Sequence, residues 1–170
     1  MFAVSLIMGV VGSHHRENTM RVYLAGPIFG CTDKECKHWR ARARAALLGV
    51  EVLDPMERDY RYSERDIYRK IVKDDKSAID RCDLLLVNFL RPSVGTSMEI
   101  LYAWERKKHV LIFTEAQALS PWLLFHSNAV VRSLEDAVAY IWRLVRRRQV
   151  TTHQPTARTL GKQTHTRGGR

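Results

Sequence analysis

A continuous apolar run, Leu84-Leu85-Leu86-Val87, restricts the fold of this chain more than any other part of its sequence. The run follows Asp83 and precedes a loop-forming stretch at 91–95, so it is too short for a typical helix. A strand with this pattern is buried on both faces, as in a parallel sheet that helices cover on both sides. The segment 83–89 is therefore predicted to be an inner strand of such a sheet.

Strands and helices alternate along the rest of the chain. Further strands are predicted at 21–24, 50–53, 109–113 and 129–131, and helices at about 33–48, 64–81, 96–106 and 134–147. This alternation implies right-handed crossovers between parallel strands. The predicted fold class is α/β, a single doubly wound domain of the Rossmann or flavodoxin-like type with a parallel sheet of about five strands.

Hydroxyl side chains stand at three of the predicted helix starts, namely Thr32, Ser63 and Ser133. Thr32 and Glu35 also have the spacing of a capping box. Each hydroxyl is expected to accept a hydrogen bond from the first turn of its helix. The helix that follows Ser63 is expected to run to about Arg81 and to tolerate a break.

The length of 170 residues suits one domain with one core. We predict a domain at 20–148, a loose N-terminal extension at 1–19 and a disordered basic tail at 149–170. Met20 directly precedes the first strand and is expected to be the functional start.

The net charge of +10 belongs mainly to the C-terminal end of the sequence. Residues 143–170 hold eight Lys and Arg and no Asp or Glu, and residues 1–19 hold one Arg and one Glu, which leaves +2 for residues 20–142. The tail is expected to be solvated. The alternative is a weak, nonspecific contact of the tail with nucleic acid or another polyanion.

The first twelve residues are apolar, but they lack a basic leading region and an evident cleavage site, and they are too short to cross a bilayer. No membrane association is therefore predicted. Cys31, Cys36 and Cys82 are odd in number and lack zinc-like spacing, which argues against a disulfide framework and against a metal site. The expected location is the reducing cytoplasm.

Ligands of doubly wound sheets bind at the carboxyl ends of the strands. The segments 25–29, 54–62 and 89–96 follow three predicted strands and are expected to meet there. Gly26 and Gly95 would let the backbone approach a ligand closely. Thr96 and the amide groups behind it form a predicted helix N-terminus, which suits an anion or a sugar hydroxyl. Because no GxGxxG or P-loop pattern is present, a dinucleotide or nucleoside triphosphate enzyme is not favoured.

Glu99 has two interpretations from spacing alone. Thr96-Ser97-Met98-Glu99 fits a capping box, which would make the glutamate part of a purely structural helix start. Alternatively, a carboxylate held at this edge could attack an electrophilic sugar carbon, as carboxylates do in glycosidases. Tyr23 is by default a core aromatic residue, Asp75 a solvated charge and Asp83 a structural residue at the opposite edge.

The same residues resemble the nucleoside 2-deoxyribosyltransferase family, which includes the 2'-deoxynucleoside 5'-phosphate N-hydrolases. The similarity covers about Met20 to Ile141 and rests on four elements in a fixed order. They are Val22-Tyr23-Leu24-Ala25-Gly26-Pro27-Ile28, Leu53-Asp54-Pro55, Asp75 eight residues before Asp83-Leu84-Leu85-Leu86-Val87, and Pro92-Ser93-Val94-Gly95-Thr96-Ser97-Met98-Glu99.

The resemblance implies a role for each matching position. Glu99 would attack C1' of the deoxyribose and hold a covalent intermediate, Asp75 would protonate the departing base, and Tyr23 would orient the nucleophile. Asn128 resembles a residue that a neighbouring subunit lends to the 5' end of the sugar, which implies a homodimer or a higher homo-oligomer. The remaining expected substrate-binding residues are Gly26, Pro27, Ile28, Ser93, Gly95 and Thr96.

The implied substrates are a deoxynucleoside or deoxynucleotide and a free nucleobase, and the chemistry requires no metal or organic cofactor. Transferases of this family often carry an aspartate six residues before the glutamate, where this chain has Ser93. In the hydrolase branch a serine at this place contacts the 5'-phosphate, but the first loop here lacks the serine and arginine of that branch. Deoxyribosyl transfer is therefore expected first and monophosphate hydrolysis second. A catalytically silent nucleotide-binding module with a nucleic-acid-docking tail is the third alternative.

Overall fold

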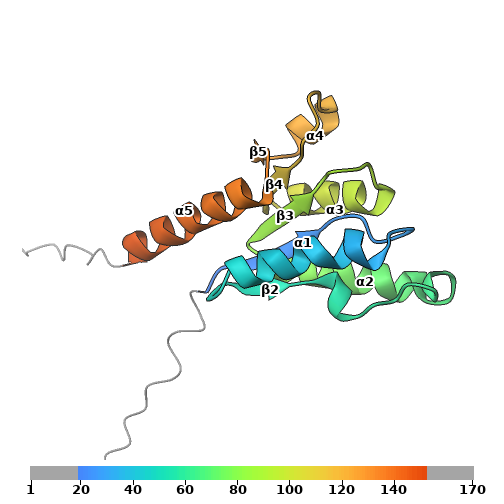
Figure 1. Ribbon diagram of the computed structural model, residues 1–170. Coiled ribbons are helices and arrows are strands. Elements are labelled where there is room, and N and C mark those ends of the chain that lie inside the picture. Colours follow the sequence, from blue (N-terminus) through green and yellow to red (C-terminus); the bar gives the residue numbers. More distant parts are fainter. Residues whose placement is uncertain (1–18, 153–170) are drawn as a thin grey trace, which may run out of the picture.

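The computed structural model describes residues 19–152, which form a parallel five-stranded sheet with helices on both faces (Figure 1). The strand order is β2-β1-β3-β4-β5, so the predicted doubly wound α/β class is confirmed. The strands are β1 (Arg21–Ala25), β2 (Glu51–Leu53), β3 (Leu84–Asn88), β4 (His109–Phe113) and β5 (Ala129–Val131). The helices are α1 (Asp33–Ala46), α2 (Glu64–Arg81), α3 (Val94–Glu105), α4 (Pro121–Phe125) and α5 (Leu134–Thr152), with a short 3-10 helix η1 (Pro55–Glu57).

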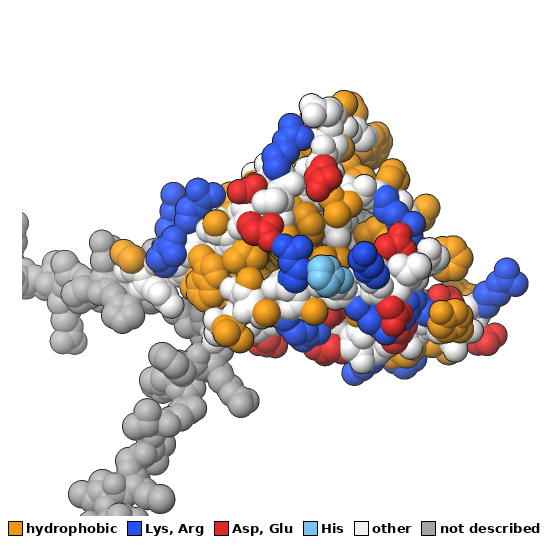
Figure 2. Space-filling view, viewed as in Figure 1, with side chains coloured by type: hydrophobic (Ala, Val, Ile, Leu, Met, Phe, Trp, Pro, Cys, Tyr) orange, Lys and Arg blue, Asp and Glu red, His pale blue; other side chains and the backbone are white. Residues whose placement is uncertain are grey.

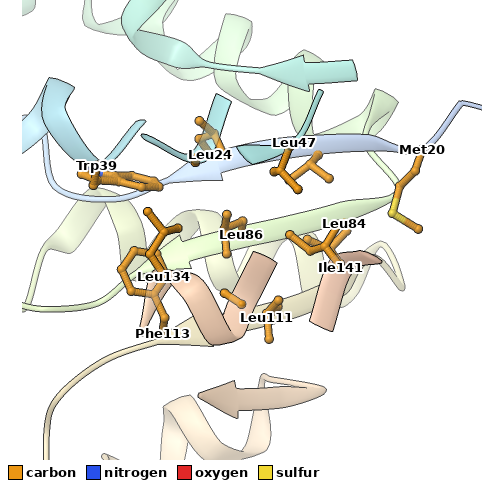
Figure 3. Close-up of a cluster of buried hydrophobic side chains, with 13 residues drawn as sticks. Met20, Leu24, Trp39, Leu47, Leu84, Leu86, Leu111, Phe113, Leu134 and Ile141 are labelled. Carbon is orange, nitrogen blue, oxygen red and sulfur yellow. The ribbon is translucent and has the colours of Figure 1, made fainter. Parts of the chain in front are cut away.

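The apolar run of β3 lies in the middle of the sheet, and all five residues of the strand are buried. On one face, β1 and β3 pack against α1 and α5, and Figure 3 shows Leu24, Leu86, Trp39 and Ile141 distributed along this layer. The other face packs against α2 and α3. Alternate residues of β1 enter the two layers, so the strand directs Tyr23 toward α2 and α3.

Several helix ends differ from the predicted ones. Thr32 forms both hydrogen bonds of the expected capping box with Glu35, but the Ser63 side chain makes no capping bond, and α2 has a break at Ile67. Helix α3 begins at Val94 instead of Thr96. Helix α5 continues to Thr152, beyond the predicted end near Arg147.

Helix α4 is absent from the prediction. It has five residues and starts with Ser120 as its N-cap and Pro121 at its first position, which is a common helix start. Such a short segment has too few residues to show a helical period, so its apolar side chains gave no clear sequence signal.

The proposed N-terminal extension lies outside the described residues except for Thr19, and most of the proposed tail, 153–170, lies outside them too. Within the described part, no helix is both long and apolar enough to cross a membrane. Figure 2 shows Lys and Arg side chains next to Asp and Glu over most of the visible face, with a separate basic group over the C-terminal half of α5. This distribution agrees with the near-neutral charge that the sequence gives for the domain.

Candidate active site

Strands β1 and β3 are neighbours, while the chain passes from β1 to β2 on one side and from β3 to β4 on the other. This reversal of direction is a topological switch point, where the loops at the carboxyl ends of the strands diverge and leave room for a ligand. The loop after β1 and the start of α3 border this point. The sequence-predicted residues Tyr23, Asp75 and Glu99 come together beside it.

The hydroxyl of Tyr23 donates a hydrogen bond of 2.7 Å to Oε1 of Glu99. Tyr23 is fully buried on the inner strand β1, and Glu99 is half-buried in the second turn of α3. Because the strand and the helix are both rigid, their 76-residue separation in sequence does not loosen the contact. The tyrosine therefore fixes the orientation of the carboxylate.

The capping-box interpretation of Glu99 is wrong. The N-cap of α3 is Ser93, whose hydroxyl accepts a hydrogen bond of 3.4 Å from the Thr96 amide. Thr96 therefore lies inside the first turn, and Glu99 is too far along the helix to cap it. The carboxylate of Glu99 instead points away from its own helix start and accepts the hydrogen bond of Tyr23 in β1.

Asp75, half-buried on α2, is the second carboxyl of the site. Burial raises its pKa to about 6, although a hydrogen bond with Tyr23 and the charge of Arg40 oppose this shift. Burial and the negative charge of Asp75 together raise the pKa of Glu99 to about 8, again against Tyr23 and Arg40. Burial and the two carboxylates raise the pKa of Tyr23 well above its usual value, so the phenol stays protonated.

Because the two carboxyls interact, they titrate as one unit. Between a pH of about 6 and a pH of about 8, this unit holds one proton and one negative charge. A single site thus supplies a carboxylate and a carboxylic acid at neutral pH. This combination is the one that glycosidic bond cleavage requires.

Arg40 is a buried residue of the site region that the sequence prediction missed. Its side chain is 1% exposed, and its Nε lies 3.3 Å from Oδ1 of Asp54, which is 5% exposed. A basic residue on a helix is by default predicted to be a solvated charge. Its spacing from the buried residues Cys36, Ala43 and Leu47 was the available signal, because i, i+3, i+4 positions share one helix face.

The two glycines of the expected ligand edge differ in what surrounds them. A Cβ on Gly26 would lie 2.8 Å from Trp39 Cζ2 and 3.1 Å from Asn88 Cβ, so close packing requires this glycine. A Cβ on Gly95 would meet nothing within 4 Å. Only Gly95 therefore borders open space into which a ligand could fit.

The remaining expected substrate-binding residues also lie around the carboxyl edge, with one exception. Pro27 is buried and Ile28 half-buried in the loop after β1, and the buried Thr96 hydroxyl has no hydrogen-bond partner within the described residues. The exception is Asn128, which is exposed at the start of β5 and accepts a hydrogen bond of 2.7 Å from the amide of Val110 near the start of β4. It lies at the amino edge of the sheet and not beside Glu99 of the same chain.

Two further sequence expectations concern the acidic and thiol groups. Asp83 lies at the amino edge, where its carboxylate accepts a hydrogen bond of 2.8 Å from the Arg21 amide, in agreement with a structural role. Cys31, Cys36 and Cys82 are free thiols. Within residues 19–152, no group of three or more His, Cys, Asp and Glu side chains is placed to hold a metal ion.

Comparison with known proteins adds a family to this geometry. The model of the family described as nucleoside 2-deoxyribosyltransferase matches residues 22–120, more than half of the chain. The match begins in β1 and ends just before α4. It contains Tyr23, Asp75 and Glu99. No curated protein matches the chain.

Solved structures with the same fold include two deoxyribosyltransferases. That of Bacillus psychrosaccharolyticus has 20% sequence identity and a TM-score of 0.60, over 74% of this chain and 95% of the other. That of Leishmania mexicana has 22% identity and a TM-score of 0.56, over 73% and 97%. A conserved protein of Enterococcus faecalis V583 has 16% identity and a TM-score of 0.58, over 74% and 99%. At these identities, the likeness establishes a common fold.

Proposed function

Because the chain belongs to the nucleoside 2-deoxyribosyltransferase family, we propose that it transfers the deoxyribosyl group of a 2'-deoxynucleoside to a second nucleobase through a covalent bond to Glu99. Membership of this family makes the chain an enzyme of the deoxyribosyltransferase and N-glycosidase type. The observation that carries the proposal is the 2.7 Å hydrogen bond between Tyr23 and Glu99 next to the second carboxyl, Asp75.

In the first step, the Glu99 carboxylate attacks C1' of the deoxyribose while the bond from C1' to the base nitrogen breaks. The electron pair of that bond goes to the base, which receives the proton of Asp75. The product is an ester between C1' and Glu99, together with a neutral free base and the Asp75 carboxylate. The negative charge below C1' stabilises the oxocarbenium-like transition state.

In the second step, a different nucleobase attacks C1' and the ester bond to Glu99 breaks. The incoming base gives its proton to Asp75, which restores the acid, and Glu99 leaves as a carboxylate. Two displacements at C1' give retention of configuration. Water in place of the second base would give hydrolysis instead.

The reacting form requires the shared proton to lie on Asp75, whereas Glu99 has the higher pKa in the ligand-free protein. The Tyr23 hydroxyl interacts with both carboxyls. It can donate its hydrogen to an ionised Glu99 while it accepts one from a protonated Asp75. This arrangement supports a reacting form in which the two carboxyls keep separate roles.

A chromatographic base-exchange assay tests the proposal. The purified protein is given a deoxynucleoside together with a different free base. We expect a new deoxynucleoside from the wild type and none from Glu99→Ala. Glu105→Ala is the matched control, because Glu105 is an exposed residue of the same helix. Exchange that survives Glu99→Ala, or no cleavage of any deoxynucleoside or deoxynucleotide by the wild type, would contradict the proposal.

Hydrolysis of a deoxynucleoside monophosphate is the second candidate, and the position of Ser93 favours it. Ser93 caps α3 next to Gly95, whose surroundings are open, and a helix N-terminus attracts a phosphate. Ser93→Asp separates the two reactions because aspartate is also a good N-cap but repels a phosphate. Loss of monophosphate hydrolysis with retained base exchange would assign Ser93 to a phosphate; loss of neither would remove this role.

The expected homodimer or higher homo-oligomer and the cytoplasmic location belong to the same proposal. Free cysteines are consistent with a reducing compartment. Trp122 and Phe125 of α4, 73% and 70% exposed, support an oligomer because large aromatic side chains are enriched at interfaces. Light scattering of the purified chain tests the oligomer, and a monomer at assay concentration would contradict it.

A further inference from the structure

Arg40 is the buried charge that the proposed mechanism does not use. The guanidinium is 1% exposed, whereas Arg44, one turn later on α1, has a side chain that is 40% exposed. Removing a cation from water is costly unless good partners compensate it. The contacts of Arg40 therefore indicate what it does in the protein.

The guanidinium of Arg40 joins two loops at the carboxyl edge of the sheet. Its Nη2 donates a hydrogen bond of 3.0 Å to the carbonyl oxygen of Gly26, directly after β1. Its Nε lies 3.3 Å from Oδ1 of Asp54, directly after β2. The third contact, from Nη1 to the carbonyl oxygen of Cys36, anchors the side chain to its own helix. A planar guanidinium can hold these groups in a fixed relative position.

Asp54 extends this connection into the next loop. Its carboxylate also accepts a hydrogen bond of 2.8 Å from Arg44 and one of 2.9 Å from the Met56 amide, so it caps η1. The loop that begins with Gly26-Pro27-Ile28 and the loop that begins with Asp54 are thus held to α1 and to each other.

The charge of Arg40 also reaches the two carboxyls of the site. It lowers the pKa of Glu99 and of Asp75 and so opposes the effect of burial. The groups that face Arg40 are Tyr23 of β1, Cys36 of its own helix, Asp54 after β2, Asp75 of α2 and Glu99 of α3. Of the cations in the described part of the chain, Arg40 is the one that acts on both carboxyls.

We propose that Arg40 is a positioning residue of this site: its guanidinium fixes the loop of Gly26 against the loop of Asp54, and its buried positive charge favours the ionised form of the carboxyl pair. The inference rests on the proposed function, because a nucleophilic carboxylate is needed for glycosyl transfer. Without the charge, both carboxyls hold their protons to a higher pH. The rate then rises only at a pH where the pair has lost its first proton.

The test compares the pH dependence of kcat/KM for base exchange in the wild type, Arg40→Lys, Arg40→Met and Arg44→Met. In the wild type, the rate is expected to rise through the lower pKa of the pair and to fall through the higher one. Arg40→Met should move the rising limb upward by about one pH unit, the smaller end of the effect of a nearby opposite charge. Arg40→Lys keeps the charge and should leave the rising limb in place. Its rate should be lowered about tenfold, because an ammonium group cannot hold the two loops together as the planar guanidinium does.

Arg44→Met is the matched control. Arg44 lies on the same helix and also contacts Asp54, but within the described residues its charge is not among the causes of the shifts at Glu99 and Asp75. It should leave the rising limb unchanged. A folded Arg40→Met protein whose limb coincides with that of the wild type would overturn the proposal.

Two additions keep the test decisive. Arg40→Met deprives Asp54 of one partner and can destabilise the fold, so the double variant Arg40→Met/Asp54→Asn is measured beside it. Carbon-13 NMR of the side-chain carboxyls follows the titration directly, with Glu99→Gln and Asp75→Asn for assignment. If Arg40→Met shifts the titration of the carboxyls but the wild type shows no glycosyl transfer, the proposed function is contradicted and the effect of the Arg40 charge is retained. If Arg40→Met does not shift the titration, the role of Arg40 is contradicted whether or not the wild type is active.

Discussion

The buried hydroxyl of Tyr23 connects two carboxyls whose pKa values burial has raised. A hydrogen bond to a charged partner stabilises it by about 1.5–3 kcal/mol. At this site the bond favours the ionised form of Glu99, which is the form that would attack a sugar. The contribution of a single hydroxyl can therefore be measured as a change in rate.

Tyr23→Phe should lower kcat/KM about ten- to a hundredfold, the rate equivalent of such a hydrogen bond. It should also shift the rising limb of the pH profile upward, because the Tyr23 hydroxyl lowers the pKa of both carboxyls and this effect is lost. The phenyl ring fills the same buried space, so the fold is expected to persist. Tyr102→Phe is the control, because Tyr102 bonds Asp80 at the surface. An unchanged profile for Tyr23→Phe would show that the tyrosine only fills the core.

At the scale of the elements, most of the sheet could be predicted because short apolar strands between capped helices leave few alternatives. Local sequence did not determine where α3 begins: Ser93 and Thr96 are both good N-caps, and the structure has Ser93 in this role. Local sequence also could not predict, without the family resemblance, that Tyr23, Asp75 and Glu99 lie side by side. The helical crossovers between the strands bring these three residues together. Arg40 was missed because its burial depends on acceptors at Gly26 and Asp54 that are distant in sequence.

We predict opposite effects on stability when Gly26 and Gly95 are each replaced by alanine. Gly26→Ala should destabilise the fold by about 1–3 kcal/mol, because its Cβ would overlap Trp39 and the neighbouring strand β3. Gly95→Ala should raise stability by up to about 1 kcal/mol through helix propensity, but it should raise KM if a ligand approaches the start of α3. Urea unfolding and steady-state kinetics measure both effects. Equal stability changes for the two variants would contradict this account of the packing.

At the scale of the whole molecule, the site weakens the fold. Burial raises the pKa of Glu99 from 4.5 to about 8, so within this window the folded protein keeps a proton that the unfolded chain has released. The contribution of Glu99 to the free energy of unfolding is therefore fully present below its pKa in the unfolded chain, 4.5. It is lost as the pH rises through the pKa in the folded protein, about 8. Asp75 acts in the same direction over a narrower window, up to about 6.

Glu99→Gln should therefore raise the melting temperature, and by more at the alkaline end of this window than at its acidic end. Glutamine has a similar shape and carries no charge at any pH. Glu115→Gln, at an exposed position after β4, should have no such pH dependence. Thermal unfolding followed by circular dichroism at several pH values measures the difference. An advantage of Glu99→Gln that does not depend on pH would mean that the carboxyl is not perturbed in this way.

The direction of α5 predicts that the basic tail does not take part in catalysis. Helix α5 runs antiparallel to the strands and passes Asp83 at the amino edge, where Arg148 lies 3.3 Å from the Asp83 carboxylate. The chain thus leaves the domain at the edge opposite Glu99. Truncation after Thr152 should leave kcat/KM unchanged, and a loss of nucleic-acid binding in the same variant would assign that role to the tail. A marked fall in kcat/KM would mean that the tail reaches the site.

Trapping the intermediate tests the central claim most directly. The protein is mixed with a deoxynucleoside in the absence of an acceptor base, quenched in acid and digested, and the peptide that contains Glu99 is weighed by mass spectrometry. The account predicts that this peptide is heavier by one deoxyribosyl group, that the adduct disappears when a second base is added before quenching, and that Glu99→Gln forms none. An adduct on a different residue, or base exchange by Glu99→Gln, would contradict the assignment of Glu99 as the nucleophile.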